Sequence, residues 1–131
     1  MKRFRALSPL AVLLVGVAVC AGQIVFMGQL LPERVASHFG ANGVADGYMS
    51  RDSFLTMQWV LTGFVAALFA GIGALLRTVP ADTINLPNRD YWLAPARREA
   101  TLAYLTARMY VFGSATLALL AAVNQQVYEA N

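Results

Sequence analysis

Three long apolar stretches, separated by two polar loops, dominate the pattern of this chain. No charged residue falls within residues 6–32 or 53–76, and a third apolar stretch covers residues 109–128. A helix of about 20 apolar residues spans the ~30 Å hydrocarbon core of a bilayer. The pattern therefore predicts an all-α integral membrane helical bundle with three transmembrane helices, at about residues 7–31, 53–76 and 104–127.

The third span is the least apolar of the three. Asn124, Gln125 and Gln126 lie near its end, where we expect them at the level of the lipid headgroups. Arg108 lies near its beginning and would extend its side chain toward the nearer surface. This helix should begin as a surface segment near Pro95, with Leu102 and Leu105 facing lipid.

The first stretch could instead be a cleaved signal peptide. Lys2, Arg3 and Arg5 supply a basic start, and Val19-Cys20-Ala21 offers an acceptable cleavage site. The apolar residues continue to Leu31, however, well past the roughly 7–15-residue core of a signal peptide. We therefore expect an uncleaved helix in which Cys20 is a small buried residue.

Composition supports a membrane domain over residues 1–131. The chain is 58% hydrophobic and 13% charged, and a soluble chain of 131 residues could not bury that much apolar surface. With a formal net charge of only +3, we expect the lipid bilayer as a partner and no nucleic acid.

Sequence motifs for catalysis are missing. The chain has one His and one Cys, and it has no phosphate-binding loop, nucleophile elbow or helical pair of zinc-binding histidines. We therefore expect no enzyme activity, no catalytic residue, no cofactor and no metal.

Basic residues are distributed unequally between the loops. Three Lys or Arg residues precede the first span, two lie in the loop at 32–52, and four lie in the loop at 77–103. Because Lys and Arg concentrate in cytoplasmic loops, the N-terminus and the inner loop, 77–103, should be cytoplasmic. The outer loop, 32–52, and the C-terminus should face outward from a multi-pass protein of the inner (cell) membrane.

The outer loop should be folded. Pro32 and Glu33 suit the first turn of a short helix, which would place Val35 and Phe39 on one face and end at Gly40. Further along, Asn42-Gly43 and Asp46-Gly47 are typical of turns, and Ser50 or Asp52 could cap the second span.

His38 is the candidate for chemistry in this loop. With Glu33, Asp46 or Asp52 it could bind a metal or relay a proton. A single histidine with scattered acids is a weak ligand pattern, so the favoured interpretation is a structural histidine that helps to shape a partner-binding loop together with Asp46.

The inner loop contains the densest polar cluster, which runs from Asn88 to Trp92 and continues in Arg97-Arg98-Glu99. Residues 85–92 should be irregular or extended. The cluster could recognise a phosphate, a lipid headgroup or a cytoplasmic partner, or it could anchor the loop at the membrane surface. Its candidate binding residues are Asn88, Arg89, Asp90, Tyr91 and Trp92.

Glycines in the second span permit close helix contacts. Gly63, Gly71 and Gly73 could serve packing within one bundle, which we favour, or formation of a homo-oligomer.

Two loop motifs resemble a known family. The first is LPERVASHFGANGVADG at residues 31–47, and the second is NLPNRDYWLAP at residues 85–95, followed by Arg97-Arg98-Glu99. Together they resemble a bacterial membrane protein family of unknown function, whose domain also forms the N-terminal part of SdpI-like toxin-immunity proteins. The motifs and their flanking helices cover nearly the whole chain.

The resemblance implies an inner-membrane protein without an assigned activity. SdpI-like members act in immunity to a secreted toxin and sequester a transcription repressor at the membrane. This chain lacks their additional C-terminal helices, and stand-alone relatives continue into a fourth helix. The resemblance therefore implies a four-helix family fold that lacks its last helix here.

Two functions compete on these observations. The first is a non-enzymatic accessory, immunity or envelope-signalling protein that meets a protein partner on either face of the membrane. The alternative is a small transporter or channel subunit, against which the absence of charge within the spans counts.

Overall fold

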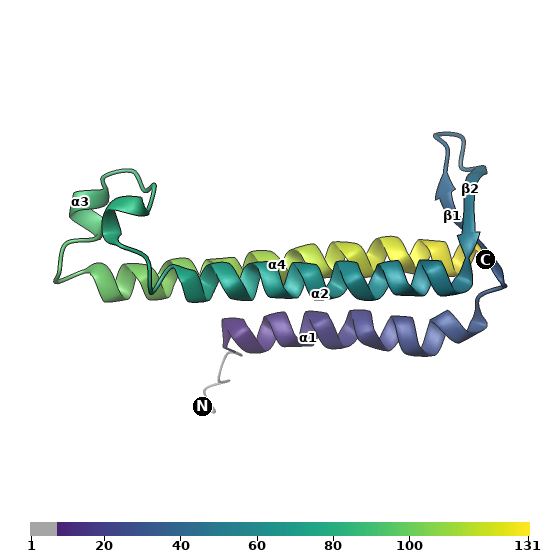
Figure 1. Ribbon diagram of the computed structural model, residues 1–131, viewed down its shortest axis with the longest axis horizontal. Coiled ribbons are helices and arrows are strands. Elements are labelled where there is room, and N and C mark those ends of the chain that lie inside the picture. The colour runs from purple at the N-terminus through teal and green to yellow at the C-terminus, as the bar shows by residue number, and fades with distance from the viewer. Residues whose placement is uncertain (1–7) are drawn as a thin grey trace, which may run out of the picture.

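A computed structural model describes residues 8–131, and Lys2, Arg3 and Arg5 lie outside the described residues. Within this part of the chain, three helical runs are long and apolar enough to cross a membrane, which confirms the predicted fold class. They are α1 (Pro9–Gly22), extended to Leu30 by a π-helical and a 3-10 turn, α2 (Arg51–Leu75) and α4 (Arg98–Ala130) (Figure 1).

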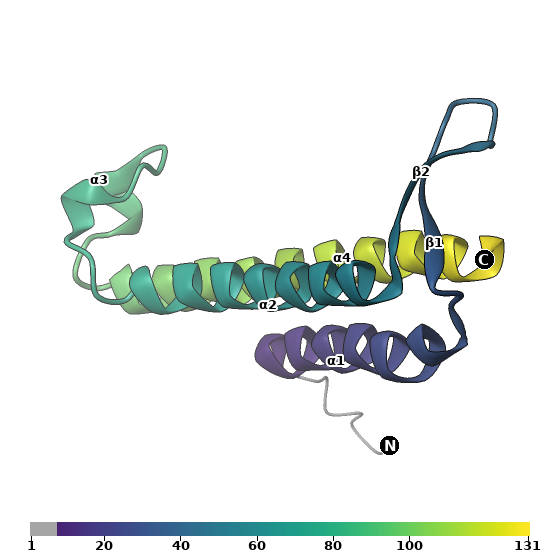
Figure 2. The same ribbon diagram turned by 45° about the vertical axis from the view of Figure 1, so that its right-hand side comes forward.

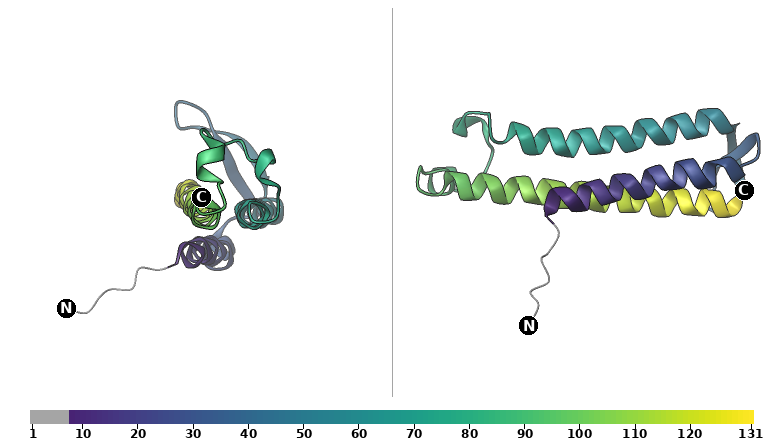
Figure 3. Two further views of the ribbon diagram at one scale, coloured as in Figure 1. Left: turned by 90° about the vertical axis from the view of Figure 1, so that its left-hand side faces the viewer. Right: turned by 90° about the horizontal axis from the view of Figure 1, so that it is seen from below.

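Helix α4 makes most of the contacts between the three long helices. It packs along both α1 and α2, which contact one another less (Figure 3). The chain direction makes α1 and α4 parallel and α2 antiparallel to both. With 33 residues, α4 is about 50 Å long and extends beyond the other two at one end.

Small residues and leucines form the contact between α1 and α4. Leu13, Cys20 and Leu117 are fully buried there, and a Cβ added at Gly16 would lie 3.2 Å from Leu117. The Cys20 thiol points at the Leu117 carbonyl oxygen, 3.5 Å away. Cys20 is thus the small buried residue that the sequence predicts.

The contact between α2 and α4 depends on a different pair of glycines. A Cβ added at Gly73 would lie 2.8 Å from the Tyr110 ring, and one added at Gly113 would lie 2.8 Å from Phe69. By contrast, added Cβ atoms at Gly63 and Gly71 would meet nothing within 4 Å. Packing within the bundle is therefore confirmed for Gly73 alone among the three predicted glycines.

The outer surface of the bundle is apolar. Large hydrophobic side chains that face outward from the three helices include Leu14, Val19, Val60, Phe64 and Leu119. Such a continuous apolar surface fits contact with lipid, as the composition predicts.

The outer loop forms a β-hairpin, so the prediction of a short helix after Pro32 is wrong. Strands β1 (Arg34–Phe39) and β2 (Ala45–Ser50) pair antiparallel and project from the bundle (Figure 2). Residues four apart share a face in a strand as well as in a helix. The spacing of Val35 and Phe39 therefore fits both structures, and pairing with β2 decides between them.

The turn predictions for this loop have mixed outcomes. At Asn42-Gly43 a turn is present: Gly43 has a φ of +75°, and Asn42 Oδ1 accepts a hydrogen bond from the Val44 amide. At Asp46-Gly47 the turn prediction is wrong, because both residues lie within β2. Ser50 caps α2, since its hydroxyl oxygen accepts a hydrogen bond from Ser53 N.

The inner loop is more ordered than its prolines predict. Residues Ala81–Thr83 form a 3-10 turn and Arg89–Trp92 form α3, a single helical turn (Figure 1). The prediction that 85–92 is irregular or extended is thus wrong for its second half. Leu102 was expected to face lipid and is buried instead, because Ile84 and Leu93 fold back onto it.

Candidate functional site

The predicted binding residues separate to opposite ends of the bundle. His38 and Asp46 lie on the hairpin, at what we call the hairpin end. The other five lie at the α3 end, on and before α3 (Figure 1). The sequence therefore singles out two surfaces rather than one composite site.

A buried cluster joins the hairpin firmly to the helices. Val35 from β1 and Phe54 from α2 are almost completely buried, against Leu31, Val127 and Tyr128. The Phe54 and Tyr128 rings meet edge to face, with centroids 6.1 Å apart. Each fully buried large side chain contributes about 1.5–3 kcal/mol. The hairpin is therefore a fixed extension of the bundle.

Polar contacts fasten the same junction. The Arg51 amide donates to the Glu33 carbonyl oxygen at 2.9 Å, and the Arg51 guanidinium donates to the Leu31 carbonyl oxygen at 3.3 Å. These bonds tie the start of α2 to the chain that enters β1. They use backbone carbonyls that would otherwise lie unpaired near the membrane surface.

His38 and Asp46 meet across the hairpin, as the sequence allowed. His38 Nδ1 and Asp46 Oδ1 are 2.5 Å apart, and both side chains are more than half exposed. Gly47 permits this contact, since a Cβ there would lie 2.8 Å from His38 Cβ. Among residues 8–131, no group of three or more His, Cys, Asp or Glu side chains forms a metal-binding arrangement.

A cleft of about 450 Å³ lies between the hairpin and the last turns of α4. Ser37, His38 and Phe39 form the hairpin side of this hairpin cleft. Val123, Gln126 and Val127 are among the residues on the α4 side. The sequence predicted binding residues only on the hairpin side of this cleft. The α4 side was not predicted, because α4 and β1 are about 90 residues apart in the chain.

Polar side chains also meet inside the bundle near the hairpin end. Asn124 Nδ2 donates to Gln58 Oε1 at 3.0 Å, and both side chains are buried. Gln23, at the start of the π-helical turn, donates to Ala121 O and Gln125 Oε1. Asn124 therefore links α4 to α2, whereas we had expected it to reach the headgroups.

Near the Asn124–Gln58 pair, three more polar atoms are buried and have no hydrogen-bond partner among the described residues. They are Gln23 Oε1, the Thr62 hydroxyl and the Tyr128 hydroxyl. A buried polar group without a hydrogen bond costs about 1–3 kcal/mol. Like Asn124 and Gln58, these groups place polar side chains among the packed helices near the hairpin end.

At the α3 end, arginines hold the loop together through backbone carbonyls. Arg89 donates to Asp82 O at 3.0 Å and lies 3.5 Å from the Asp90 carboxylate. Arg98 donates to Val79 O at 3.2 Å. These contacts favour the structural interpretation for Arg89, one of the two that the sequence left open.

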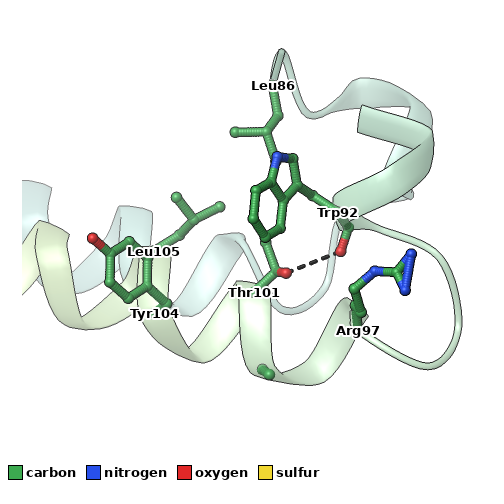
Figure 4. A pocket seen from close by; sticks show the side chains of 7 residues that line it. Leu86, Trp92, Arg97, Thr101, Tyr104 and Leu105 are labelled. Atoms are coloured by element: carbon green, nitrogen blue, oxygen red, sulfur yellow. Dashed lines mark hydrogen bonds between the residues drawn. The ribbon is translucent and has the colours of Figure 1, made fainter. Parts of the chain in front are cut away.

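Arg97 and Trp92 differ from Arg89 because they line a pocket. The Arg97 guanidinium lies 3.9 Å from the centroid of the Tyr91 ring, and its Nε donates to Tyr91 O at 3.0 Å. Trp92 is held through its own carbonyl oxygen, which accepts from the Thr101 hydroxyl at 2.9 Å (Figure 4). The side chains of Trp92 and Arg97 are both exposed.

This α3 pocket has a volume of about 530 Å³ and is mainly apolar. Leu86 and Trp92 form its outer wall, and Tyr104 and Leu105 lie on the side toward the bundle (Figure 4). Arg97 lies on the side of the pocket opposite Tyr104 and Leu105 (Figure 4). The sequence included Arg97 in the polar cluster that could recognise a phosphate, but it did not list Arg97 among the candidate binding residues or predict a pocket.

Part of the chain matches a known protein family. Residues 12–63 match a protein family described as "Domain of unknown function (DUF1648)". The matched region contains most of α1, the whole hairpin and the first half of α2, so it includes His38 and Asp46. The α3 end lies outside it, and no curated protein and no solved structure matches the chain.

Proposed function

We propose that this chain is a non-enzymatic protein of the inner membrane, an accessory, immunity or envelope-signalling protein that binds a protein partner through the hairpin cleft. The unequal distribution of Lys and Arg supports an N-terminus in the cytoplasm and a hairpin that faces outward. The loop motif's resemblance to SdpI-like immunity proteins supports a toxin or an envelope component as the partner class.

The observation that carries this proposal is a rigid hairpin that overhangs a cleft. A recognition loop binds best when it is held in its bound conformation beforehand, because less conformational entropy is then lost. The buried Val35–Phe54 junction supplies that rigidity. The cleft combines apolar Phe39 and Val123 with polar His38 and Gln126, a mixture typical of protein contacts.

Site-specific photo-crosslinking in cells tests this proposal. A photoreactive residue at Val44, at the exposed tip of the hairpin, should form an adduct with another polypeptide. Leu119 is similarly exposed but lies on the lipid-facing surface of α4, so the same residue there should capture lipid.

The adduct must also depend on the cleft. Gln126→Ala should weaken the Val44 adduct while leaving the protein's level in the membrane unchanged. A polypeptide adduct of equal strength at Val44 and Leu119, or one that Gln126→Ala leaves unchanged, contradicts binding in the cleft.

The alternative, a small transporter or channel subunit, requires association of several copies. Gly63, Ala67 and Gly71 lie four residues apart on the exposed surface of α2, and small residues at this spacing allow close helix approach. Protein-dependent ion flux in liposomes, reduced by Ala67→Leu, would favour this function over the accessory role.

A further inference from the structure

We infer that the α3 pocket binds an anionic phospholipid, with its phosphate at Arg97 and its acyl chain against Tyr104 and Leu105. This inference requires that the helices lie in a bilayer. It does not depend on the partner role proposed for the hairpin cleft at the opposite end.

The position of the pocket along α4 matches the boundary between hydrocarbon and headgroups. α2 ends at Leu75, and Gly73 contacts Thr106 and Tyr110 of α4, so Leu105 lies at the level where α2 leaves the membrane. Arg97 lies eight residues earlier in the chain, about 12 Å farther from the hydrocarbon. The pocket therefore runs from the acyl-chain region to the phosphate region.

The order of side chains along the pocket follows the polarity of a phospholipid. Leu105, on the side toward the bundle, is apolar, and Tyr104 and Trp92 are amphipathic rings that favour the membrane interface. Both rings are about half exposed. Arg97 is the charged residue among those that line the pocket.

Arg97 is positioned to receive a phosphate. Its Nε donates to Tyr91 O and its guanidinium stacks on the Tyr91 ring, so part of its side-chain freedom is already lost. Among the described residues, its terminal nitrogens have no hydrogen-bond partner. Guanidinium groups bind phosphate oxygens through two parallel hydrogen bonds.

The charge around the pocket favours an anionic over a zwitterionic lipid. Residues 77–108 contain five arginines and three carboxylates. Arg108 adds to the positive field near the hydrocarbon side, with its guanidinium 4.6 Å from the Tyr104 ring centroid. A neighbouring pocket contains Arg77 and Arg98 but also the Glu99 carboxylate, which would repel a phosphate.

Fluorescence quenching by brominated lipids tests the inference. The chain has two tryptophans, so Trp59→Phe leaves Trp92 as the reporter inside the pocket. One vesicle contains phosphatidylglycerol with brominated chains in plain phosphatidylcholine. The other carries the bromine on phosphatidylcholine instead, at the same mole fraction of each lipid and of bromine. Overall composition and surface charge are then matched.

We expect brominated phosphatidylglycerol to quench Trp92 more strongly than brominated phosphatidylcholine. A hydrogen bond between two charged groups changes affinity by about tenfold. Arg97→Gln should remove about that much selectivity, whereas Arg77→Gln, which removes the same charge outside the pocket, should keep it. Ala100→Leu fills the pocket without changing charge and should also reduce selectivity.

Equal quenching by the two vesicles in the Trp59→Phe protein overturns the inference. So does an equal loss of selectivity in Arg97→Gln and Arg77→Gln, which would indicate general attraction to the surface. Soluble glycerophosphoglycerol carries the headgroup without acyl chains. It should leave the quenching unchanged, and its displacement of the lipid would assign the pocket to free phosphate esters.

Discussion

Asn131 holds Ala36 through both of its backbone polar groups. Asn131 Oδ1 accepts from the Ala36 amide at 2.8 Å, and Asn131 Nδ2 donates to the Ala36 carbonyl oxygen at 3.0 Å. One amide side chain thus pairs with β1 as a neighbouring strand would. These hydrogen bonds form on the edge of β1 that does not pair with β2. Asn131 follows the last residue of α4, so the same bonds link α4 to the hairpin.

Replacing Asn131 with Ala should loosen β1 without unfolding the bundle. The two hydrogen bonds together should contribute about 1–3 kcal/mol, since each contributes about 0.5–1.5 kcal/mol. Hydrogen exchange measured by mass spectrometry should accelerate in Arg34–Phe39 and stay unchanged in the Leu13–Leu117 contact. Unchanged exchange in β1 would contradict a role for Asn131 in fixing this strand.

Asn124 and Gln58 should behave as a coupled pair. Asn124→Leu leaves the Gln58 amide buried without its partner, so the free energy of unfolding should fall by about 1–2 kcal/mol in a detergent titration. The double variant Asn124→Leu with Gln58→Leu should recover part of that loss. Losses that simply add in the double variant would show that the two side chains do not interact.

Substitution by alanine should lower the stability of the bundle at one glycine of α2 but not at another. Gly73→Ala places a Cβ 2.8 Å from the Tyr110 ring, so it should destabilise the bundle by about 1–3 kcal/mol. Gly71→Ala is the matched control, because its Cβ would meet nothing within 4 Å. Gly71→Ala should be neutral or slightly stabilising, since Ala favours helix more than Gly. Thermal unfolding in detergent measures both.

Cysteine labelling tests the predicted orientation. Cys20 is the one cysteine of the chain and is buried, so Cys20→Ser gives a background without thiols. In that background, Ala41→Cys on the hairpin should react with a membrane-impermeant maleimide on intact spheroplasts, and Asn85→Cys should react only after lysis. The reverse pattern would place the hairpin in the cytoplasm.

The sequence predicts those features that depend on neighbours along the chain. Absence of charge locates the three membrane-spanning helices, and Ser50 and Asn42-Gly43 locate a helix cap and a turn. The hairpin was missed because a spacing of four residues fits both a helix and a strand. The alternation of half-buried and exposed residues from Ala45 to Ser50 emerges only in the fold.

Contacts between distant segments could not be predicted in the same way. Asn124 looks like an interface residue until α2 supplies Gln58 as its partner. Leu102 looks lipid-facing until residues 81–93 fold back over it. Gln126 was not predicted to bind, and Arg97 was predicted only as part of a polar cluster. Neither pocket could be predicted, because each forms where two segments of the chain meet.

Helix α4 carries a contact at each end: Asn131 and Val127 against the hairpin, and Leu102 and Thr101 against the loop that contains α3. No proline interrupts its 33 residues, so it behaves as a stiff rod. A tilt of about 5° about one end moves the other end of a ~50 Å helix by about 4 Å. Mechanical load applied to the hairpin would therefore be transmitted across the bilayer as a sideways displacement of the α3 end.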